Sequence, residues 1–411
     1  MGENGAPAPG IVTTHDGFAV SFTREEQEAK VEALINSVDE DEARQIYKLC
    51  SQNQWNYETA KRILANTDWH ADLKYFDYRP FDQRVTVFNN QVAVHLRKRA
   101  SEHMLDSKNI GLVTTRQRSQ AGGTWGNVFC ADQFIESTYI SNKTKEINYL
   151  FPLWLSASVG ENRRRPNIDR QIGTRFGNAV NLIYDDGSPH DQQDNFGSDY
   201  RKQQPEQTSL LDSDWDGRGN LATTLGPRDL FDWIYAVLYS VGYRSRYAEF
   251  LKSPYPRLPL PRGYAIFKTL APLGAQLVSL HLLNLDDAPI LRSPDITFHG
   301  TGEARVEHGY PKYENGMVLI NSNRWFEDVV PETWNFHIGG YQVCKKWLKD
   351  RAGKGGQNPS PGRILTEEDI LNYRRTATAL TETRRLMAEI DHVIEEHGGW
   401  PEAFVNSGTD K

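Results

Sequence analysis

The sequence predicts an α+β protein, in which a helical N-terminal segment precedes a β-rich middle and a long helix follows near the C-terminal end. Three observations support this prediction: valines alternate around Asn89-Asn90, a mostly apolar helical pattern starts at Pro227, and an apolar stripe of helical period begins after Thr366. Hydrophobic residues form 38% of the 411, which is enough for a buried core in a chain long enough for two or three domains.

Residues 1–75 are expected to form a helical segment that links and packs. Thr23 can cap a helix, because Glu25 and Glu26 follow it in the first turn, where the helix dipole favours acidic groups. Leu34, Ile35 and Val38 give this helix an apolar stripe. Further helical patterns occur at 41–50 and 57–64.

Residues 76–345 are expected to be β-rich with helical insertions. Valines at 85, 87, 92 and 94 flank Asn89-Asn90, which indicates a hairpin, and strands are also predicted at 110–115, 127–130, 147–155 and within 295–343. A basic helix is expected at 97–104. The stretch 156–222 is polar, has few aliphatic residues, and is interpreted as a long loop or insertion.

Residues 346–411 are predicted to contain the last helix. Thr366 starts it and Asp369 stands three residues later, as in a capping box, while Gly398-Gly399 follows its end. The most apolar stretches of the chain, 230–243 and 270–285, are short and interrupted by polar residues, so we expect no membrane span.

Sequence motifs for catalysis are not found. The three cysteines form no C-x-x-C pair, and there is no P-loop, H-E-x-x-H or G-x-S-x-G motif. Asp295 with Glu303 only loosely matches a nuclease, and 253–256 lacks the double proline of an adenine methyltransferase. We therefore expect no catalytic, metal-binding or cofactor-binding residues, no catalytic activity of the chain alone, and a reducing cytoplasmic setting.

Five segments of the chain carry a family resemblance. They lie at 76–84, 109–117, 235–260, 338–351 and 365–391, and so are spread along most of the chain. The first contains the pattern Y-R-P-F-D-x-R. In this order the five resemble the C-terminal part of type ISP restriction-modification enzymes, which have that motif, and of related type IIG enzymes.

The resemblance implies a sequence-specific DNA-recognition module of a bacterial adenine-N6 methylating system. It implies that 1–75 follows a methyltransferase core, that 76–345 is the target-recognition domain, and that 346–411 supports it. Double-stranded DNA, a methyltransferase and a helicase-nuclease are the implied partners, and S-adenosylmethionine and Mg²⁺ would be bound by the partner or parent enzyme. Two alternatives stay open: a protein-interaction remnant that does not bind DNA, and a methyltransferase with an unrecognised active site.

Basic clusters provide the candidate DNA contacts, although the formal net charge is −7. Arg116 to Arg118 is the preferred base-reading cluster, because Arg pairs with guanine and Gln with adenine. For Arg79 and Arg84, an ion pair with Asp77 or Asp82 is an equal alternative. For 97–99, the equal alternative is a solvated helix face. The predicted DNA-binding residues are Arg79, Arg84, Arg97, Lys98, Arg99, Arg116, Gln117, Arg118 and Lys345.

Overall fold

The computed structural model describes residues 8–37, 39–50, 55–105, 108–116, 125–143, 146–157, 164–187, 215–252, 255–356 and 359–405. The predicted mixture of helices and strands is confirmed, and the strands form several small sheets. Within these ranges no helix has the length and apolar character needed to cross a membrane.

The N-terminal segment is helical, as predicted. The Thr23 hydroxyl accepts a hydrogen bond from Glu26 N at 3.2 Å and so caps the first long helix. Val31 and Leu34 on that helix are fully buried, while Val38 lies outside the described residues. The elements are β1 (Ala8–Pro9), α1 (Asp16–Ala19), α2 (Arg24–Asn36), α3 (Glu40–Tyr47) and α4 (Tyr57–Ala65).

A two-stranded ribbon follows, in which β2 (Leu73–Arg79) pairs with β3 (Asp82–Val87). The predicted hairpin at Asn89-Asn90 is therefore wrong. One edge of β3 is occupied by β2, and at the other edge Val85 exchanges two backbone hydrogen bonds with Ser21, so the later valines cannot pair with it. The Asn89 side chain instead accepts a hydrogen bond from Gln91 N and forms a local turn.

A four-stranded sheet, in the order β1-β6-β4-β5, forms the centre of the molecule. Both of its faces are covered, because Val113 and Phe129 contribute to one core while Val128 and Cys130 contribute to another. The predicted basic helix is the short α5 (Lys98–Ser101) with a 3₁₀ turn (Glu102–Met104). The predicted strands are present as β4 (Gly111–Thr115), β5 (Val128–Ala131), β6 (Asn148–Pro152) and β7 (Trp154–Leu155).

The polar stretch 156–222 is not a structureless loop. It contains α6 (Arg170–Val180), which Asp169 caps by accepting hydrogen bonds from two backbone amides and which buries Phe176 and Val180. The loop interpretation is wrong for 170–180, because two apolar residues four positions apart anchor a capped helix in an otherwise polar segment. The interpretation of the stretch as an insertion stays a prediction. Residues 158–163 and 188–214 lie outside the described part. The neighbouring strands are β8 (Arg165–Pro166), β9 (Ile183–Tyr184) and β10 (Thr224–Leu225).

The predicted later helices are present. The long terminal helix α12 (Glu367–Glu396) has the expected capping box between Thr366 and Asp369. The other helices are α7 (Pro227–Tyr239), α8 (Val241–Arg246) and α9 (Tyr264–His281), with 3₁₀ turns at Trp69–Asp72, Phe250–Lys252 and Pro289–Arg292.

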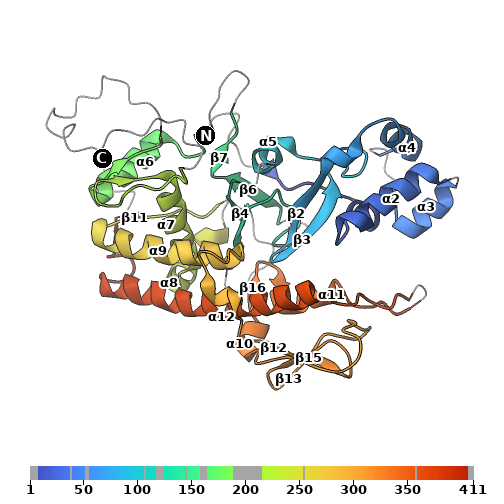
Figure 1. The fold of residues 1–411 in the computed structure, drawn as a ribbon. Helices are drawn as coiled ribbons and strands as arrows, with labels where there is room; N and C mark the ends of the chain where they lie inside the picture. The colour runs from blue at the N-terminus through green and yellow to red at the C-terminus, as the bar shows by residue number, and fades with distance from the viewer. Residues whose placement is uncertain are drawn as a thin grey trace.

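The predicted β-rich stretch between 295 and 343 forms a small separate sheet in the order β12-β15-β14-β13, which lies below α12 in Figure 1. Its strands are β12 (Thr297–Gly300), β13 (Lys312–Glu314), β14 (Met317–Leu319) and β15 (Arg324–Glu327). The remaining elements are β11 (Leu260–Pro261), α10 (Pro331–Trp334), β16 (His337–Ile338), β17 (Tyr341–Gln342), α11 (Val343–Lys349) and β18 (Phe404–Val405).

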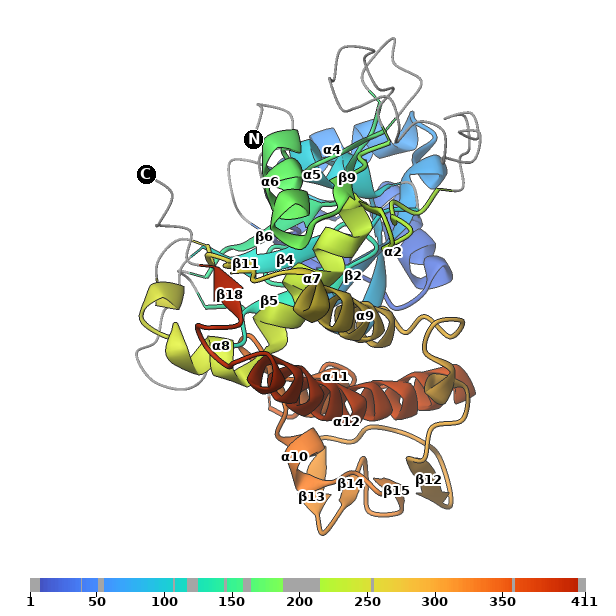
Figure 2. The same cartoon turned by 90° about the vertical axis from the view of Figure 1, so that its left-hand side faces the viewer.

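Two hydrophobic cores meet at the central sheet and at α12. The first contains residues of the N-terminal helices, the ribbon, the small sheet and the first half of α12, such as Tyr373 and Leu380. The second contains α7, α9 and the second half of α12, such as Leu386 and Ile390. Figure 2 shows α12 passing beneath α7 and α9.

Candidate nucleic-acid interface

Arg79, in the motif at 76–84, forms a buried ion pair. Its Nη1 donates to Glu136 Oε2 at 2.7 Å, and its guanidinium lies 3.8 Å from the centroid of the Tyr78 ring. Glu136 also accepts a hydrogen bond from Thr138 N. For Arg79, the structure therefore shows the ion-pair alternative. The partner is Glu136 rather than Asp77.

Arg84 belongs to a second buried network. Asp82 accepts two hydrogen bonds from Arg84, at 2.9 and 2.6 Å, and one from Arg351 at 3.0 Å. Burial opposes ionisation of Asp82, but the two guanidinium groups outweigh it and hold the pKa of this carboxyl well below its usual value. Arg79 and Arg84 are both buried and paired, so the exposed cations are the better candidates for DNA contacts.

The basic residues of α5 are exposed, in contrast. Arg97, Lys98 and Arg99 all lie at the surface, and Lys98 approaches Glu102 at 3.6 Å in a pair that is more than half exposed on both sides. Such an exposed ion pair is weak, so Lys98 can easily exchange Glu102 for another anionic partner. A phosphate contact by these three residues stays a prediction.

Arg116 extends from the end of β4 at the start of the connection to β5, and its side chain is exposed. The rest of the predicted base-reading cluster, Gln117 and Arg118, lies outside the described residues. Arg116 is thus the member of the cluster that the structure places, at one end of the central sheet.

Buried polar side chains hold the two ends of this connection together. Asn127 Nδ2 donates to Thr115 Oγ1 at 3.0 Å and to Glu146 Oε2 at 3.1 Å, and the Ser141 hydroxyl also donates to Glu146. Asn148 accepts from two backbone amides of the 140–141 segment. Because these groups are buried and satisfied together, the base of the connection is rigid.

The glycine pair of the motif at 338–351 packs against this base. Gly339 has a left-handed φ of 54° and donates from its backbone amide to Gly126 O at 2.9 Å, and Gly340 donates likewise to Ile140 O at 2.8 Å. A Cβ atom at Gly339 would clash with the Ile140 carbonyl. Lys345 follows on α11 with an exposed side chain, so the structure leaves it accessible to a phosphate.

A cluster of three aromatic side chains, one of which lies close enough to Arg116 to feel its charge, was not predicted. Tyr255 lies with its ring centroid 5.8 Å from that of Tyr149 and 5.4 Å from that of Phe151 on β6. Burial raises the pKa of Tyr255, Tyr149 adds to the effect, and the positive charge of Arg116 opposes it. Residues more than a hundred positions apart carry no local signal of such proximity.

The described residues contain no group of three or more His, Cys, Asp or Glu that could hold a metal ion. Glu303, from the loose nuclease pattern, is paired with Arg305 at 3.0 Å. The arrangement of described groups therefore offers charged, amide and aromatic contacts, which are the means by which proteins hold and read nucleic acid.

The family model for the Type ISP C-terminal specificity domain matches residues 6–389, and the chain belongs to this family. No curated protein matches it by sequence.

Three solved structures share the fold at low sequence identity. They are a nuclease-deletion mutant of the Type ISP restriction-modification enzyme LlaGI in complex with a DNA substrate mimic (TM-score 0.58, 18% identity), the ATP-dependent Type ISP enzyme LlaBIII bound to DNA (0.61, 14%) and a DrdV-DNA complex (0.64, 16%). Each match covers 93% of this chain but only 27%, 23% and 36% of the respective relative.

Proposed function

We propose that this chain recognises a DNA sequence, with the β4–β5 connection reading base edges and the exposed cations of α5 and α11 holding phosphates. The rigid base of that connection supports this assignment most directly, because contacts that discriminate bases need side chains presented from a fixed frame. Membership of a specificity-domain family, and a fold shared with enzymes solved on DNA, support the same function.

On this proposal the reaction belongs to another domain or subunit. A methyltransferase that binds S-adenosylmethionine would methylate adenine, and a helicase-nuclease that uses Mg²⁺ would cleave, in the bacterial cytoplasm. The contribution of this chain is to position them on a double-stranded target. Phosphate contacts would provide affinity and base contacts would provide selectivity.

The test is Arg116→Ala, assayed by fluorescence anisotropy on duplex DNA over a range of salt concentrations. We expect wild-type affinity to fall steeply with salt, and the variant to lose about tenfold at a guanine-containing target if Arg116 contacts a base. If it contacts only a phosphate, the logarithmic salt slope should fall by about one for every sequence. Arg385→Ala is the matched control, because it removes the same charge from an exposed ion pair on α12.

The alternatives predict different results. Absence of salt-sensitive binding to any duplex, with or without a methyltransferase partner, would exclude the DNA-recognition proposal and favour a protein-interaction module. Binding of labelled S-adenosylmethionine by the purified chain would instead indicate a methyltransferase.

A further inference from the structure

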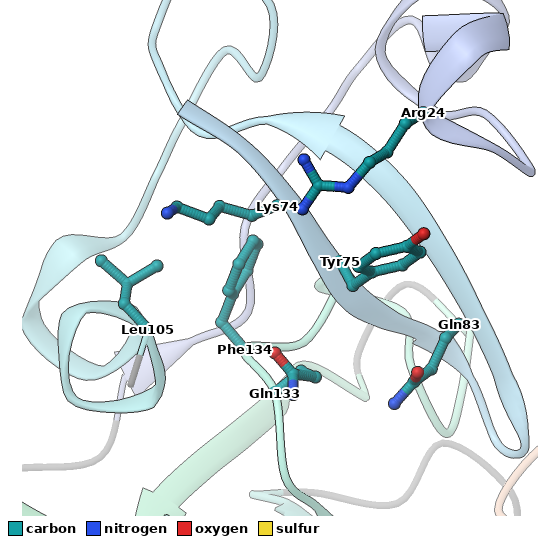
Figure 3. Close-up of a pocket in the computed structure, with 7 residues that line it drawn as sticks. All are labelled: Arg24, Lys74, Tyr75, Gln83, Leu105, Gln133 and Phe134. Carbon is teal, nitrogen blue, oxygen red and sulfur yellow. The ribbon is translucent and has the colours of Figure 1, made fainter. Parts of the chain in front are cut away.

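A pocket of about 260 Å³ lies on the β2–β3 ribbon, away from the β4–β5 connection (Figure 3). Arg116 follows the end of β4 that pairs with the start of β5, whereas Gln133 and Phe134 of the pocket come just after the end of β5. The volume is below that of a typical pocket for a drug-sized molecule and suits a smaller group. The lining residues are Arg24, Lys74, Tyr75, Gln83, Leu105, Gln133 and Phe134.

The chemistry of this lining favours an anionic, aromatic occupant. Tyr75 is 43% exposed, and the Arg24 guanidinium carbon lies 5.2 Å from the centroid of its ring. Figure 3 shows Lys74 reaching away from the strand on the side of Leu105, with Phe134 between its end and Tyr75. Among the described lining residues there are two cations and no carboxylate.

The amide of Gln83 is held in one orientation. Its Nε2 donates to Asp77 Oδ1 at 3.2 Å and to Asp132 Oδ1 at 3.3 Å, so its Oε1 faces away from the carboxylates. Among the described residues, none donates to this oxygen. Gln83, which lines the pocket, therefore has a side-chain oxygen that could accept a hydrogen bond from an occupant.

The two carboxyls behind Gln83 ionise less readily than ordinary exposed carboxyls. Burial, together with the nearby Asp132, raises the pKa of Asp77 well above its usual value, and burial also raises that of Asp132. A shared proton would reduce their joint negative charge.

We propose that this pocket holds the base of one unpaired nucleotide of a DNA strand, with the base against Tyr75, an amino group of the base on Gln83 Oε1, and the phosphate of that nucleotide near Arg24 at the rim. This proposal rests on the proposed function. Aromatic rings stack on unpaired bases, and an acceptor selects bases that carry an exocyclic amino group. Deoxyadenosine and deoxycytidine should therefore be preferred to thymidine, which has no such group.

The test uses the full chain and three labelled duplexes of one sequence: fully paired, with a single extrahelical deoxyadenosine, and with a single extrahelical thymidine. We expect the wild type to bind the deoxyadenosine bulge about tenfold more tightly than the paired duplex, because stacking of the unpaired base on Tyr75 adds to the binding free energy. Tyr75→Ala should abolish this preference, whereas the matched Tyr75→Phe should keep it. Gln83→Leu should remove the preference for deoxyadenosine over thymidine.

The outcomes separate the two proposals. Equal binding of all three duplexes, or a preference that survives Tyr75→Ala, overturns the pocket proposal and leaves DNA recognition intact. No binding to any duplex overturns both. The unfolding midpoint of each variant checks its fold, and if Tyr75→Ala is unfolded, the comparison of the two bulges with Gln83→Leu decides.

Discussion

At the scale of single residues, Asp82 connects segments that are far apart in the sequence. It joins Arg84 on the ribbon to Arg351, which follows α11. The guanidinium carbons of Arg84 and Arg363 lie 3.5 and 4.1 Å from the centroid of the Phe22 ring. A carboxylate that compensates two buried cations cannot be removed without leaving those charges unpaired. The family motif at 76–84 thus stabilises the fold.

Asp82→Asn should therefore lower the free energy of unfolding by about 3–5 kcal/mol in urea denaturation. Asp286→Asn is the matched control, because its pair with Arg292 is exposed and should change stability by less than about 1 kcal/mol. The pKa of Asp82 is lowered in the folded state, so its contribution is present above the usual value of 3.8 and is lost as the pH falls below it. Equal effects of the two substitutions would contradict the assigned role.

His281 provides a second prediction, with its own pH window. Its Nδ1 lies 2.6 Å from the Tyr235 hydroxyl oxygen and its Nε2 lies 2.8 Å from Thr383 Oγ1, and burial lowers its pKa from 6.5 to about 3. Between these values the unfolded chain binds a proton that the folded chain does not. The free energy of unfolding should then fall by up to about 1.4 kcal/mol per pH unit as the pH drops below 6.5.

Urea unfolding between pH 7 and 5 measures this dependence. His281→Gln should be less stable at pH 7, but should lose less stability on acidification than the wild type. Parallel losses in the two proteins would show that His281 is not the group responsible.

At the scale of elements, the β16–β17 hairpin braces the β4–β5 connection. Gly339 approaches the Ile140 carbonyl so closely that only a residue without a side chain fits, and its φ of 54° adds a second reason for glycine. Because α11 follows β17 directly, this contact also fixes α11 relative to the base of the β4–β5 connection.

Gly339→Ala should consequently weaken DNA binding as well as stability. Gly302→Ala is the matched control, since Gly302 also has a positive φ, of 82°, but no atom lies within 4 Å of a Cβ placed there. Both substitutions should cost about 1 kcal/mol for the backbone conformation, and Gly339→Ala should cost more because of the clash. Anisotropy should show reduced DNA affinity for Gly339→Ala alone, and an unchanged affinity would contradict the bracing role.

Local signals account for the elements that the sequence predicted correctly. Thr23 and Thr366 were recognisable as caps because their partners stand three residues away, and β4 and β6 because apolar residues mark them. The Asn89-Asn90 hairpin failed because the pairing of Val85 with Ser21 is not local. The same limitation hid the contact of Tyr255 with β6 and the burial of Arg79 against Glu136.

At the scale of the whole molecule, α12 is shared by two hydrophobic cores. Its first half packs with the ribbon and small sheet, and its second half packs with α7 and α9. A thirty-residue helix spans roughly 45 Å, so it can couple parts of the molecule that do not contact each other directly. The central sheet, covered by one core on each face, makes a second connection.

This shared helix predicts that the two cores unfold together. Leu386 is 1% exposed in the second core, and Leu386→Ala should lower stability by about 2–5 kcal/mol. Native-state hydrogen exchange should show reduced protection both in α9 and in β3 of the first core, because opening either core exposes α12. Ile172→Ala, at a side chain 62% exposed, should change neither. Loss of protection confined to α9 would mean that the two cores open independently and that α12 does not couple their unfolding.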